Sequence, residues 1–434
     1  MDWHQLLSTQ RLSEQRNSSS TYSSSRSVFN QDYGRVLYSS AFRRLQDKTQ
    51  VFPLGRNDYV RTRLTHSLEV SNVGRQLAIR LQKIICEKEE CDDKLCTLLR
   101  ESGDIVSTAC LAHDIGNPPF GHFGESAIEH AVRKLSGKDD YTFEGNAQGF
   151  RILVKTGDAI KGKGLDLTCA TLGAYVKYPC GPLSSQKGKN GIYSKHGINL
   201  EEMESFRKVA EECGLYRPDS SQDTWARHPL ALLMEAADDI SYLVADLEDA
   251  YISNIISYDE TIEHLFSLGA FSSACRNKVE DEKRLRDEDS AVRYARAIAV
   301  GCCIEAVDKT LHAYYSDIMN GTFNEKLMTK SELATPYKSL GDFSKKKIYS
   351  HESVIKVELT GYNVIEKLIE LYMEWVDNPN SPAAKRISKL LHPNPTREDE
   401  YNYRFNHMID YVSGMTDSYA LKTYVDLFGC NPVF

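Results

Sequence analysis

Several features that would narrow the class of protein are missing from this sequence. It has no uninterrupted apolar run long enough to cross a bilayer, and its first residues, MDWHQLLSTQRLSEQ, contain no apolar segment typical of a secretion signal. Its 11 cysteines are odd in number and include no CxxC pair, which argues against a disulfide framework and against the common zinc spacings. We therefore expect a soluble, cytoplasmic protein with reduced thiols and no membrane partner.

An excess of positive charge is also absent. The net charge of -8 argues against non-specific binding of nucleic acid over the whole surface, so any site for a polyanion must be local. Hydrophobic residues make up 41% of the chain and charged residues 26%, which is the composition of a globular protein. Because 434 residues exceed the usual size of one core, we expect a large core with insertions, or two lobes.

Apolar residues recur at three- and four-residue steps through most of the chain, whereas the alternation typical of strands is scarce. This pattern predicts a mainly α protein. We expect a flexible Ser-rich N-terminal arm over residues 1–30, because NSSSTYSSSRS has too little apolar surface to offset the entropy of ordering. A core is predicted over residues 31–265, with an irregular insertion at about 135–225, followed by a C-terminal helical lobe over residues 266–434.

Two histidines and two aspartates form the strongest chemical signal. His66 lies in RTRLTHSLEV, His113 and Asp114 lie in CLAHDIGNPPFGHFGE, and Asp238 lies in EAADDISYLVADLED. Taken singly, such residues are more often surface or core residues than ligands. Together, two imidazoles and two carboxylates suit a divalent cation with positions left open for water. The sequence therefore predicts a metal site if the three segments converge.

The longer motifs identify a family. HDIGNPPFGHFGE, together with FRRLQDKTQVF, RTRLTHSLEV, EAADDISYLVADLED and YVSGMTDSYAL, resembles the bacterial dGTP triphosphohydrolases of the HD superfamily from about residue 35 to residue 420. The resemblance implies an HD-domain helical core with an inserted irregular segment and a C-terminal lobe that completes a nucleotide site. It also implies hydrolysis of dGTP to deoxyguanosine and triphosphate, by attack of metal-activated water at the α-phosphorus.

His122 and Glu125 are the expected catalytic pair. They are three residues apart in GHFGE, so one helical face can present both as an acid/base pair. The resemblance assigns proton transfer at the 5′ oxygen to His122 and its orientation to Glu125. The same resemblance makes His66, His113 and Asp238 metal ligands together with the aspartate of the HD pair.

The resemblance further implies contacts to phosphates and base. Arg63, three residues before the first predicted histidine ligand, matches a phosphate-binding position, and so does Lys177, beside Tyr178 in LGAYVKYP. Glu358, in IKVELTGYNVIE, matches an acceptor for guanine N1 and N2, and Val51 matches a residue that flanks the ring. A solvated surface role is the ordinary alternative for each of the charged residues.

Sugar contacts are expected on the helix that carries the last predicted ligand. Tyr242 and Asp246 follow Asp238 at four-residue steps, so all three share one side of a helix. In similar enzymes the tyrosine packs under the deoxyribose, where a 2′ hydroxyl would clash, and the acid meets the 3′ hydroxyl. Gln50, in DKTQVF, matches a second 3′-hydroxyl contact.

The implied cofactor is a divalent metal, Mn²⁺ or Mg²⁺ first, with Fe²⁺, Co²⁺ and Zn²⁺ also compatible with such ligands. The implied partners are dGTP or other dNTPs, further copies of the chain in a dimer or hexamer, and single-stranded DNA. One alternative is another HD nucleotidase or phosphodiesterase, but Ile115 is followed by GNPPF rather than by the acidic pair of the tetraphosphate hydrolases. A nucleic-acid-binding regulatory HD protein is the other alternative, and the presence of His122 and Glu125 argues against it.

Overall fold

The computed structural model describes residues 1–13, 26–52, 59–137, 139–157, 163–185, 193–219, 222–269, 271–394 and 396–429. These residues form helices, together with three isolated β-bridges and no named strand. The mainly α fold predicted from the periodicity is therefore confirmed. None of the described helices combines the length and the apolarity that spanning a bilayer requires.

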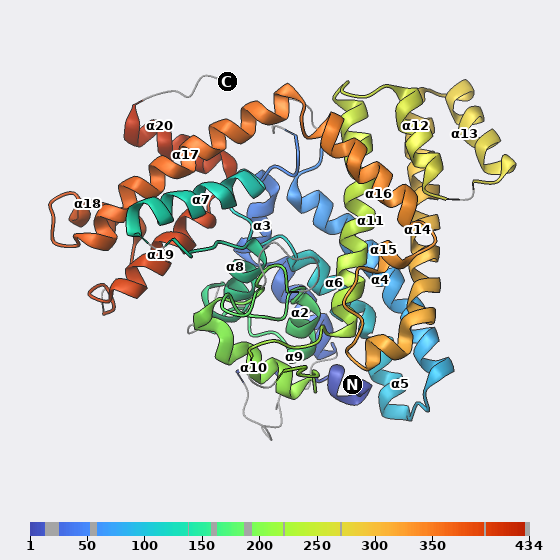
Figure 1. Ribbon diagram of the computed structural model, residues 1–434, viewed down its shortest axis with the longest axis horizontal. Helices are drawn as coiled ribbons and strands as arrows, with labels where there is room; N and C mark the ends of the chain where they lie inside the picture. The colour runs from blue at the N-terminus through green and yellow to red at the C-terminus, as the bar shows by residue number, and fades with distance from the viewer. Residues whose placement is uncertain are drawn as a thin grey trace.

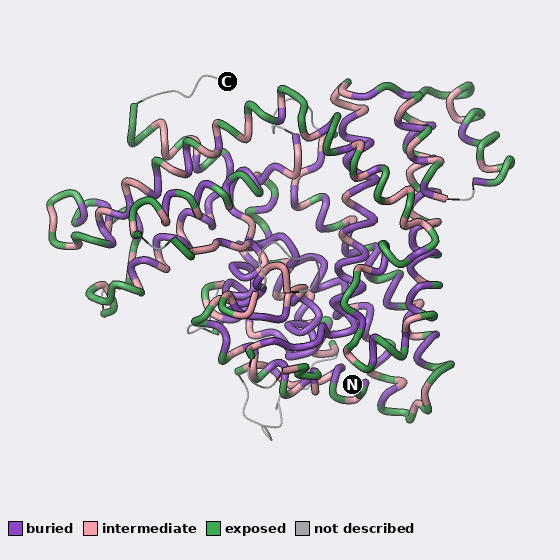
Figure 2. The backbone as a smooth tube through the Cα atoms, in the orientation of Figure 1, coloured by how far each residue is buried: buried purple, intermediate pink, exposed green. Residues whose placement is uncertain are grey.

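The first core surrounds a long central helix. It is built on these helices: α2 (Val28–Leu37), α4 (Arg63–Lys88), α6 (Ser102–Ala112), α9 (Cys169–Tyr175), α11 (Pro229–Ile252) and α14 (Glu288–Met319). In Figure 1, α11 runs down the middle of the molecule between the inner helices and α14. Nearly every residue of α11 is buried, including several acidic residues, so this helix carries both apolar core residues and charged groups into the interior. Figure 2 shows the centre of this core largely in purple, the colour of buried residues, whereas α14 at its edge alternates between purple and green.

A close contact between α4 and α6 brings the first two predicted histidine ligands near each other. An added Cβ on Gly74 would lie 2.5 Å from Cys110 Sγ and 3.0 Å from Val106 Cγ1, so only glycine permits this approach of the two helices. His66 lies two turns before Gly74 on α4, and His113 follows the last turn of α6. The packing of two apolar helix faces thus brings two predicted ligands to the same region.

The second core is smaller and joins distant parts of the chain. It is formed by these helices: α7 (Gly121–Ser136), α17 (Glu352–Asp377), α18 (Ala384–Leu391), α19 (Tyr401–Ser413) and α20 (Asp417–Phe428). Figure 1 shows α7 lying along α17 on the side of the molecule away from α14. The two cores do not follow the boundary expected near residue 265. Helix α7 precedes that boundary but packs with the C-terminal helices, whereas α14 follows it but packs on α11.

The region expected to be an irregular insertion, at about residues 135–225, contains buried helical segments. These are α8 (Gly145–Arg151), the π-helical turn η2 (Ile152–Thr156), α9, the short turn η3 (Leu200–Glu202) and α10 (Met203–Glu212). Phe150 and Phe206 are fully buried and meet edge to face, with ring centroids 5.8 Å apart. The described part of the insertion is thus part of the first core. The Lys/Gly-rich stretches 158–162 and 186–192 lie outside the described residues.

Shorter helices complete the architecture. They are α3 (Ser40–Arg44), η1 (Leu45–Asp47), α5 (Asp93–Arg100), α12 (Tyr258–Ser267), α13 (Ser273–Leu285), α15 (Leu327–Lys330), α16 (Ala334–Phe343) and η4 (Ser344–Ile348). α12 and α13 pack with α14 at the outer edge of the first core.

The N-terminus differs from the flexible arm expected over residues 1–30. Helix α1 (Trp3–Leu6) packs against the first core, where Trp3 and Leu6 are fully buried, and Trp3 Nε1 donates to Tyr315 Oη at 2.8 Å. Arg11 forms a buried ion pair with Asp32. The expectation overlooked the apolar residues that precede the Ser-rich stretch; residues 14–25, which hold most of that stretch, lie outside the described residues.

This packing predicts that the first residues contribute to stability. We expect Trp3→Ala to lower the free energy of unfolding by about 3 kcal/mol, because it leaves a cavity and removes the hydrogen bond that Trp3 donates to Tyr315, whose hydroxyl still donates to Glu89. Tyr38→Ala is the control, since Tyr38 is 76% exposed, and its effect should stay within about 0.5 kcal/mol. Denaturant unfolding followed by circular dichroism measures both values, and equal midpoints for the two variants would contradict the packing described here.

Candidate active site

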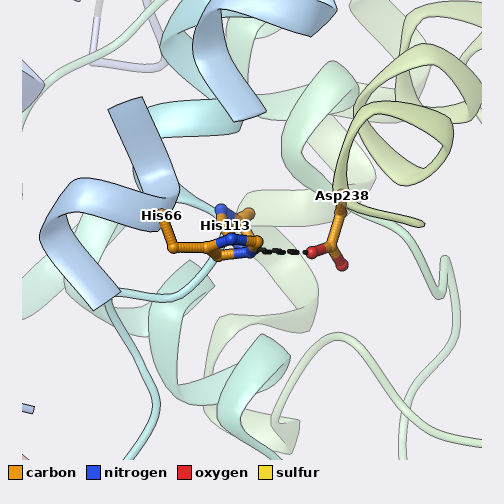
Figure 3. Close-up of side chains that lie close together, drawn as sticks. All are labelled: His66, His113 and Asp238. Atoms are coloured by element: carbon orange, nitrogen blue, oxygen red, sulfur yellow. Dashed lines mark hydrogen bonds and ion pairs between the residues drawn. The ribbon is translucent and has the colours of Figure 1, made fainter. Parts of the chain in front are cut away.

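Three of the predicted ligands come from three separate helices. Thr62 caps α4 in a reciprocal capping box with Thr65, which fixes the first turn of α4 and therefore His66. His113 follows the last residue of α6, and Asp238 lies in the middle of α11. Figure 3 shows the two imidazole rings side by side, with the Asp238 carboxylate facing them.

The donor atoms of these residues lie within the reach of one ion. Asp238 Oδ1 lies 3.3 Å from His66 Nε2 and 3.5 Å from His113 Nε2, and the three donor atoms lie within 4.8 Å of one another. Metal–ligand bonds of about 2.0–2.2 Å place neighbouring donor atoms roughly 3–3.5 Å apart. The imidazoles are almost completely buried, whereas the Asp238 side chain is 24% exposed and marks the open side of the cluster.

Hydrogen bonds and charges orient the side chains of the cluster as metal ligands would be oriented. His113 Nδ1 lies 2.7 Å from the carbonyl oxygen of Cys110, which can only accept, so Nδ1 carries the proton and Nε2 keeps its lone pair for a ligand bond. Despite burial, which opposes ionisation, His113 and a hydrogen bond from His66 hold the pKa of Asp238 far below its usual range. An imidazole nitrogen beside an ionised carboxylate is a donor set that divalent cations use.

Asp114 lies beside this compact set but outside it. Its Oδ1 lies 3.5 Å from His113 Nε2 and accepts a hydrogen bond of 2.6 Å from Asn117 Nδ2. Its Oδ2 accepts from Arg63 Nη1 at 2.6 Å. Burial opposes ionisation here too, but Arg63 and then His113 outweigh it and lower the pKa of Asp114 to about 2. The carboxylate is therefore ionised and adjacent to the cluster, with its position set by Arg63 and Asn117.

His122 and Glu125 form the expected pair on α7. His122 Nδ1 lies 2.7 Å from Glu125 Oε2, and the other oxygen of Glu125 accepts from the backbone N–H of Gly145 at 2.8 Å. Glu125 is held in place, whereas the His122 side chain is 79% exposed. Arg63, which binds Asp114, also reaches the start of α7, because an added Cβ on Gly121 would lie 2.9 Å from Arg63 Nη2, and the Glu125 carboxylate acts electrostatically on its guanidinium.

Two of the predicted sugar contacts, Tyr242 and Asp246, lie beside a tyrosine that sequence reasoning missed. Tyr349 donates a hydrogen bond to Asp246, and its ring centroid lies 6.1 Å from that of Tyr242. Asp246 is buried, and burial raises the pKa of its carboxyl group to about 7. Tyr349 follows the short segment η4, far from any motif, so nothing in the sequence singled it out.

A second group of charges lies on the other side of Asp238. Lys177 Nζ lies 3.7 Å from Asp238 Oδ2 and 3.7 Å from Glu235 Oε1, and 5.8 Å from the centre of the Tyr178 ring. Lys326, which was not predicted, lies 3.9 Å from the same Glu235 oxygen. Asn117 was also missed, although its position three residues after Asp114 in HDIGN is a signal that could have found it.

The remaining predicted contacts are less closely tied to the cluster. Gln50 precedes α4 by a short segment, and its Oε1 is buried without a hydrogen-bond partner among the described residues. Val51 is half-buried against the first core. Glu358 is half-buried on α17, where burial raises its pKa, and it forms no ion pair or hydrogen bond with the residues that the structure describes. The structure does not bring Glu358 into contact with the cluster.

Comparison with known proteins identifies the class. The HD domain family matches residues 63–148, and the phosphohydrolase-associated domain matches residues 327–426. The first match includes the segment from Arg63 to Gln148, which carries two histidines of the cluster and the His122–Glu125 pair. The chain is thus a hydrolase of the HD superfamily.

Full-length relatives narrow this to one family. A deoxyguanosinetriphosphate triphosphohydrolase-like protein of Synechocystis sp. is 36% identical over 452 residues, covering 99% of both chains. The deoxyguanosinetriphosphate triphosphohydrolase of Yersinia enterocolitica is 32% identical over 514 residues, covering 98% of both chains. That of Cronobacter sakazakii is 33% identical over 485 residues, covering 92% of this chain. This chain belongs to the family of deoxyguanosinetriphosphate triphosphohydrolases and related proteins.

The cluster predicts a specific loss of metal binding. We expect His113→Ala to weaken Mn²⁺ binding at least 100-fold, because residues that merely orient ligands already contribute about 10–100-fold. His130→Ala is the matched control, since that side chain is 56% exposed on α7. Electron paramagnetic resonance of free Mn²⁺ during titration measures both affinities, and similar affinities for the two variants would count against the cluster.

Asp246 predicts a pH-dependent stability. Its folded pKa of about 7 exceeds the unfolded value of about 3.9, so the folded protein binds this proton more tightly. Stability therefore falls as the pH rises from about 4 to about 7 and stays lower above that. We expect Asp246→Asn, which keeps an acceptor for Tyr349, to raise the Tm of the metal-free protein at pH 8 much more than at pH 5.

The control for this measurement is Asp259→Asn, which changes an exposed acid on the neighbouring helix α12. Scanning calorimetry at both pH values should show almost no shift for that variant. A Tm difference between Asp246→Asn and the wild type that is the same at pH 5 and pH 8 would show that the buried carboxyl group titrates normally.

Proposed function

We propose that this HD-superfamily hydrolase is a metal-dependent dNTP triphosphohydrolase that converts dGTP and water into deoxyguanosine and triphosphate. One observation carries the proposal: the donor atoms of His66, His113 and Asp238 face one point, beside Asp114. The relatives named above support the reaction, and several of them are named for dGTP. Among the dNTPs, dGTP is the first substrate to test.

The proposed ligands are His66, His113, Asp114 and Asp238. A divalent ion held there would supply Lewis-acid polarisation of a phosphoryl oxygen and would lower the pKa of water for attack at the α-phosphorus. Mn²⁺ or Mg²⁺ is the proposed cofactor, because a mixed set of nitrogen and carboxylate donors accepts several divalent ions. Fe²⁺, Co²⁺ and Zn²⁺ are compatible with the same donors.

Cations of the chain would stabilise the triphosphate. Arg63 lies between Asp114 and the start of α7, and its planar guanidinium suits two phosphate oxygens at once. Lys177 lies on the opposite side of Asp238, with Tyr178 beside it. In the proposed arrangement, these two side chains approach the triphosphate from opposite sides and neutralise charge that develops on its oxygens.

His122 would deliver the proton that the departing 5′ oxygen needs. Its Nδ1 is held by Glu125, which leaves Nε2 as the nitrogen that faces solvent and substrate. Glu125 in turn is held by the N–H of Gly145, so the orientation of the imidazole depends on two fixed partners. Burial raises the pKa of Glu125, but its hydrogen bond with His122 outweighs burial and lowers that pKa, so Glu125 remains an acceptor.

The deoxyribose would lie against Tyr242, with Asp246 and Gln50 at its 3′ hydroxyl. The buried Oε1 of Gln50, which has no hydrogen-bond partner in the part of the chain that the structure describes, is an acceptor that a hydroxyl group can satisfy. Glu358 and Val51 would contact the base. Oligomerisation and binding of single-stranded DNA stay predictions from the family resemblance, and the cytoplasmic location stays a prediction from the sequence.

The reaction is tested by product analysis. Purified protein with Mn²⁺ or Mg²⁺ is incubated with each dNTP and NTP, and the products are separated by chromatography. We expect deoxynucleoside and intact triphosphate, with dGTP the fastest substrate. His122→Ala should lower kcat by about 10²–10⁴-fold, the usual contribution of a positioned acid or base, whereas His130→Ala should not.

Isotopic water locates the bond that breaks. In H₂¹⁸O we expect the label in triphosphate and none in the deoxynucleoside, because water attacks phosphorus rather than the 5′ carbon. Release of monophosphate or pyrophosphate would contradict the proposed reaction and favour another HD nucleotidase. Label in the nucleoside would contradict the position of attack.

A further inference from the structure

A single carboxylate near the C-terminus holds two segments that surround the proposed site. Asp417 is the first residue of α20 and is only 7% exposed. Its Oδ2 accepts from Thr49 N at 2.9 Å and from Thr49 Oγ1 at 2.6 Å, and its Oδ1 accepts from Phe120 N at 2.9 Å. Both oxygens are therefore used, by donors that lie about 300 or more residues away in sequence. We call Asp417, Thr49 and Phe120 the Asp417 junction.

Thr49 lies where the chain enters the proposed site. It forms a β-bridge with Thr62, the capping residue of α4, and Arg63 N donates to Lys48 O at 3.1 Å. Gln50 and Val51 follow directly. The position of Thr49 therefore affects both the start of α4, which carries Arg63, and the segment proposed to contact sugar and base.

Phe120 lies two residues before His122 in an unusual backbone conformation. Its φ of 61° and ψ of 21° are left-handed, which bulky side chains rarely adopt, and no side chain caps α7 at this residue. An added Cβ on Gly361 of α17 would lie 2.2 Å from Phe120 Cγ, so the ring is packed tightly against that helix. The hydrogen bond to Asp417 fixes the N–H of the residue that sets where α7 begins.

Lys48 adds a second link between the same parts of the chain. Its side chain is buried and donates to the carbonyl oxygens of Asn117 and of Ser413, the latter at 3.0 Å. Asn117 is the residue that binds Asp114, and Ser413 ends α19. The loop between the HD pair and α7 is thus tied to the C-terminal helices at two points.

We propose that Asp417 is a positioning residue for the reaction, which rests on the function proposed above. It fixes the backbone at Phe120 so that His122 and Glu125 face the substrate, and it holds Thr49 so that Gln50 meets the sugar. Asparagine cannot replace it, because its NH₂ group would face either the Thr49 donors or the Phe120 N–H, and two donors cannot form a hydrogen bond with each other. Asp417 touches neither substrate nor metal in this account and acts through the two segments.

The test compares two buried aspartates that each accept two hydrogen bonds from one threonine, although the second oxygen of Asp32 pairs with Arg11 rather than with a backbone N–H. Asp32 Oδ2 also accepts from a threonine, Thr168 N at 2.9 Å and Thr168 Oγ1 at 2.7 Å, but it lies away from the junction. We expect Asp417→Asn to lower kcat at least about tenfold in Mn²⁺, since small displacements of catalytic groups are costly. Its Mn²⁺ affinity should match the wild type. Asp32→Asn, compared per folded molecule, should keep kcat within about twofold, because it disturbs no catalytic group.

A milder variant covers the case in which Asp417→Asn does not fold. Thr49→Val keeps the backbone N–H bond and the side-chain shape but removes the hydroxyl donor. We expect it to raise KM for dGTP more than it lowers kcat, because Gln50 and Val51 follow it, and to raise KM little for dideoxy-GTP, which lacks the 3′ hydroxyl. Unchanged kcat and KM in either folded variant, or equal losses in Asp417→Asn and Asp32→Asn, would overturn the proposal.

Hydrogen exchange separates this proposal from the proposed function. If the wild type hydrolyses no nucleotide, the function fails. The junction is still tested, because Asp417→Asn should speed exchange of the amides of Thr49 and Phe120 through Glu125 and leave those of α9 unchanged. If the amides of Asp417→Asn exchange at the same rates as those of the wild type, the positioning role itself is overturned.

Discussion

Two imidazole nitrogens and an ionised carboxylate lie within 4.8 Å of one another in a mostly buried position, with a second ionised carboxylate beside them. Buried acceptors and charges are costly unless a partner compensates them. His113 Nδ1 donates to a carbonyl group, which turns its Nε2 toward Asp238 and His66. A divalent cation is the partner that such a set of donor atoms suits, and the proposed roles of the surrounding residues depend on it.

Two packed cores hold this arrangement. The first brings α4, α6 and α11 together, and the close approach at Gly74 places His66 and His113 beside each other. The second packs α7 on α17. Helix α7 carries His122 and Glu125, so the C-terminal helices support the catalytic pair. Metal binding and proton transfer would therefore depend on different cores, joined by Arg63 and by the Asp417 junction.

The sequence predicted the helical class. Its motifs also singled out His66, His113, Asp114 and Asp238, and the structure places the first two and Asp238 in one cluster with Asp114 beside it. It also predicted the contact between His122 and Glu125, since three-residue spacing determines it locally. It did not predict that Trp3, Leu6 and Leu7 are buried, because one helical turn of apolar residues is too short to stand out as a periodic pattern. Tyr349 and Lys326 reach the site through tertiary packing alone, and the boundary near residue 265 failed because α7 packs with helices more than 200 residues later.

The central claim is that one divalent ion joins the three helices. The most direct measurement is anomalous diffraction from a crystal of the protein grown with Mn²⁺, recorded near the manganese edge. The account predicts one strong peak within about 2.0–2.3 Å of His66 Nε2, His113 Nε2 and a carboxylate oxygen of Asp238, with Asp114 turned toward it. A fully loaded crystal whose peak lies elsewhere, with these side chains facing apart, would contradict it.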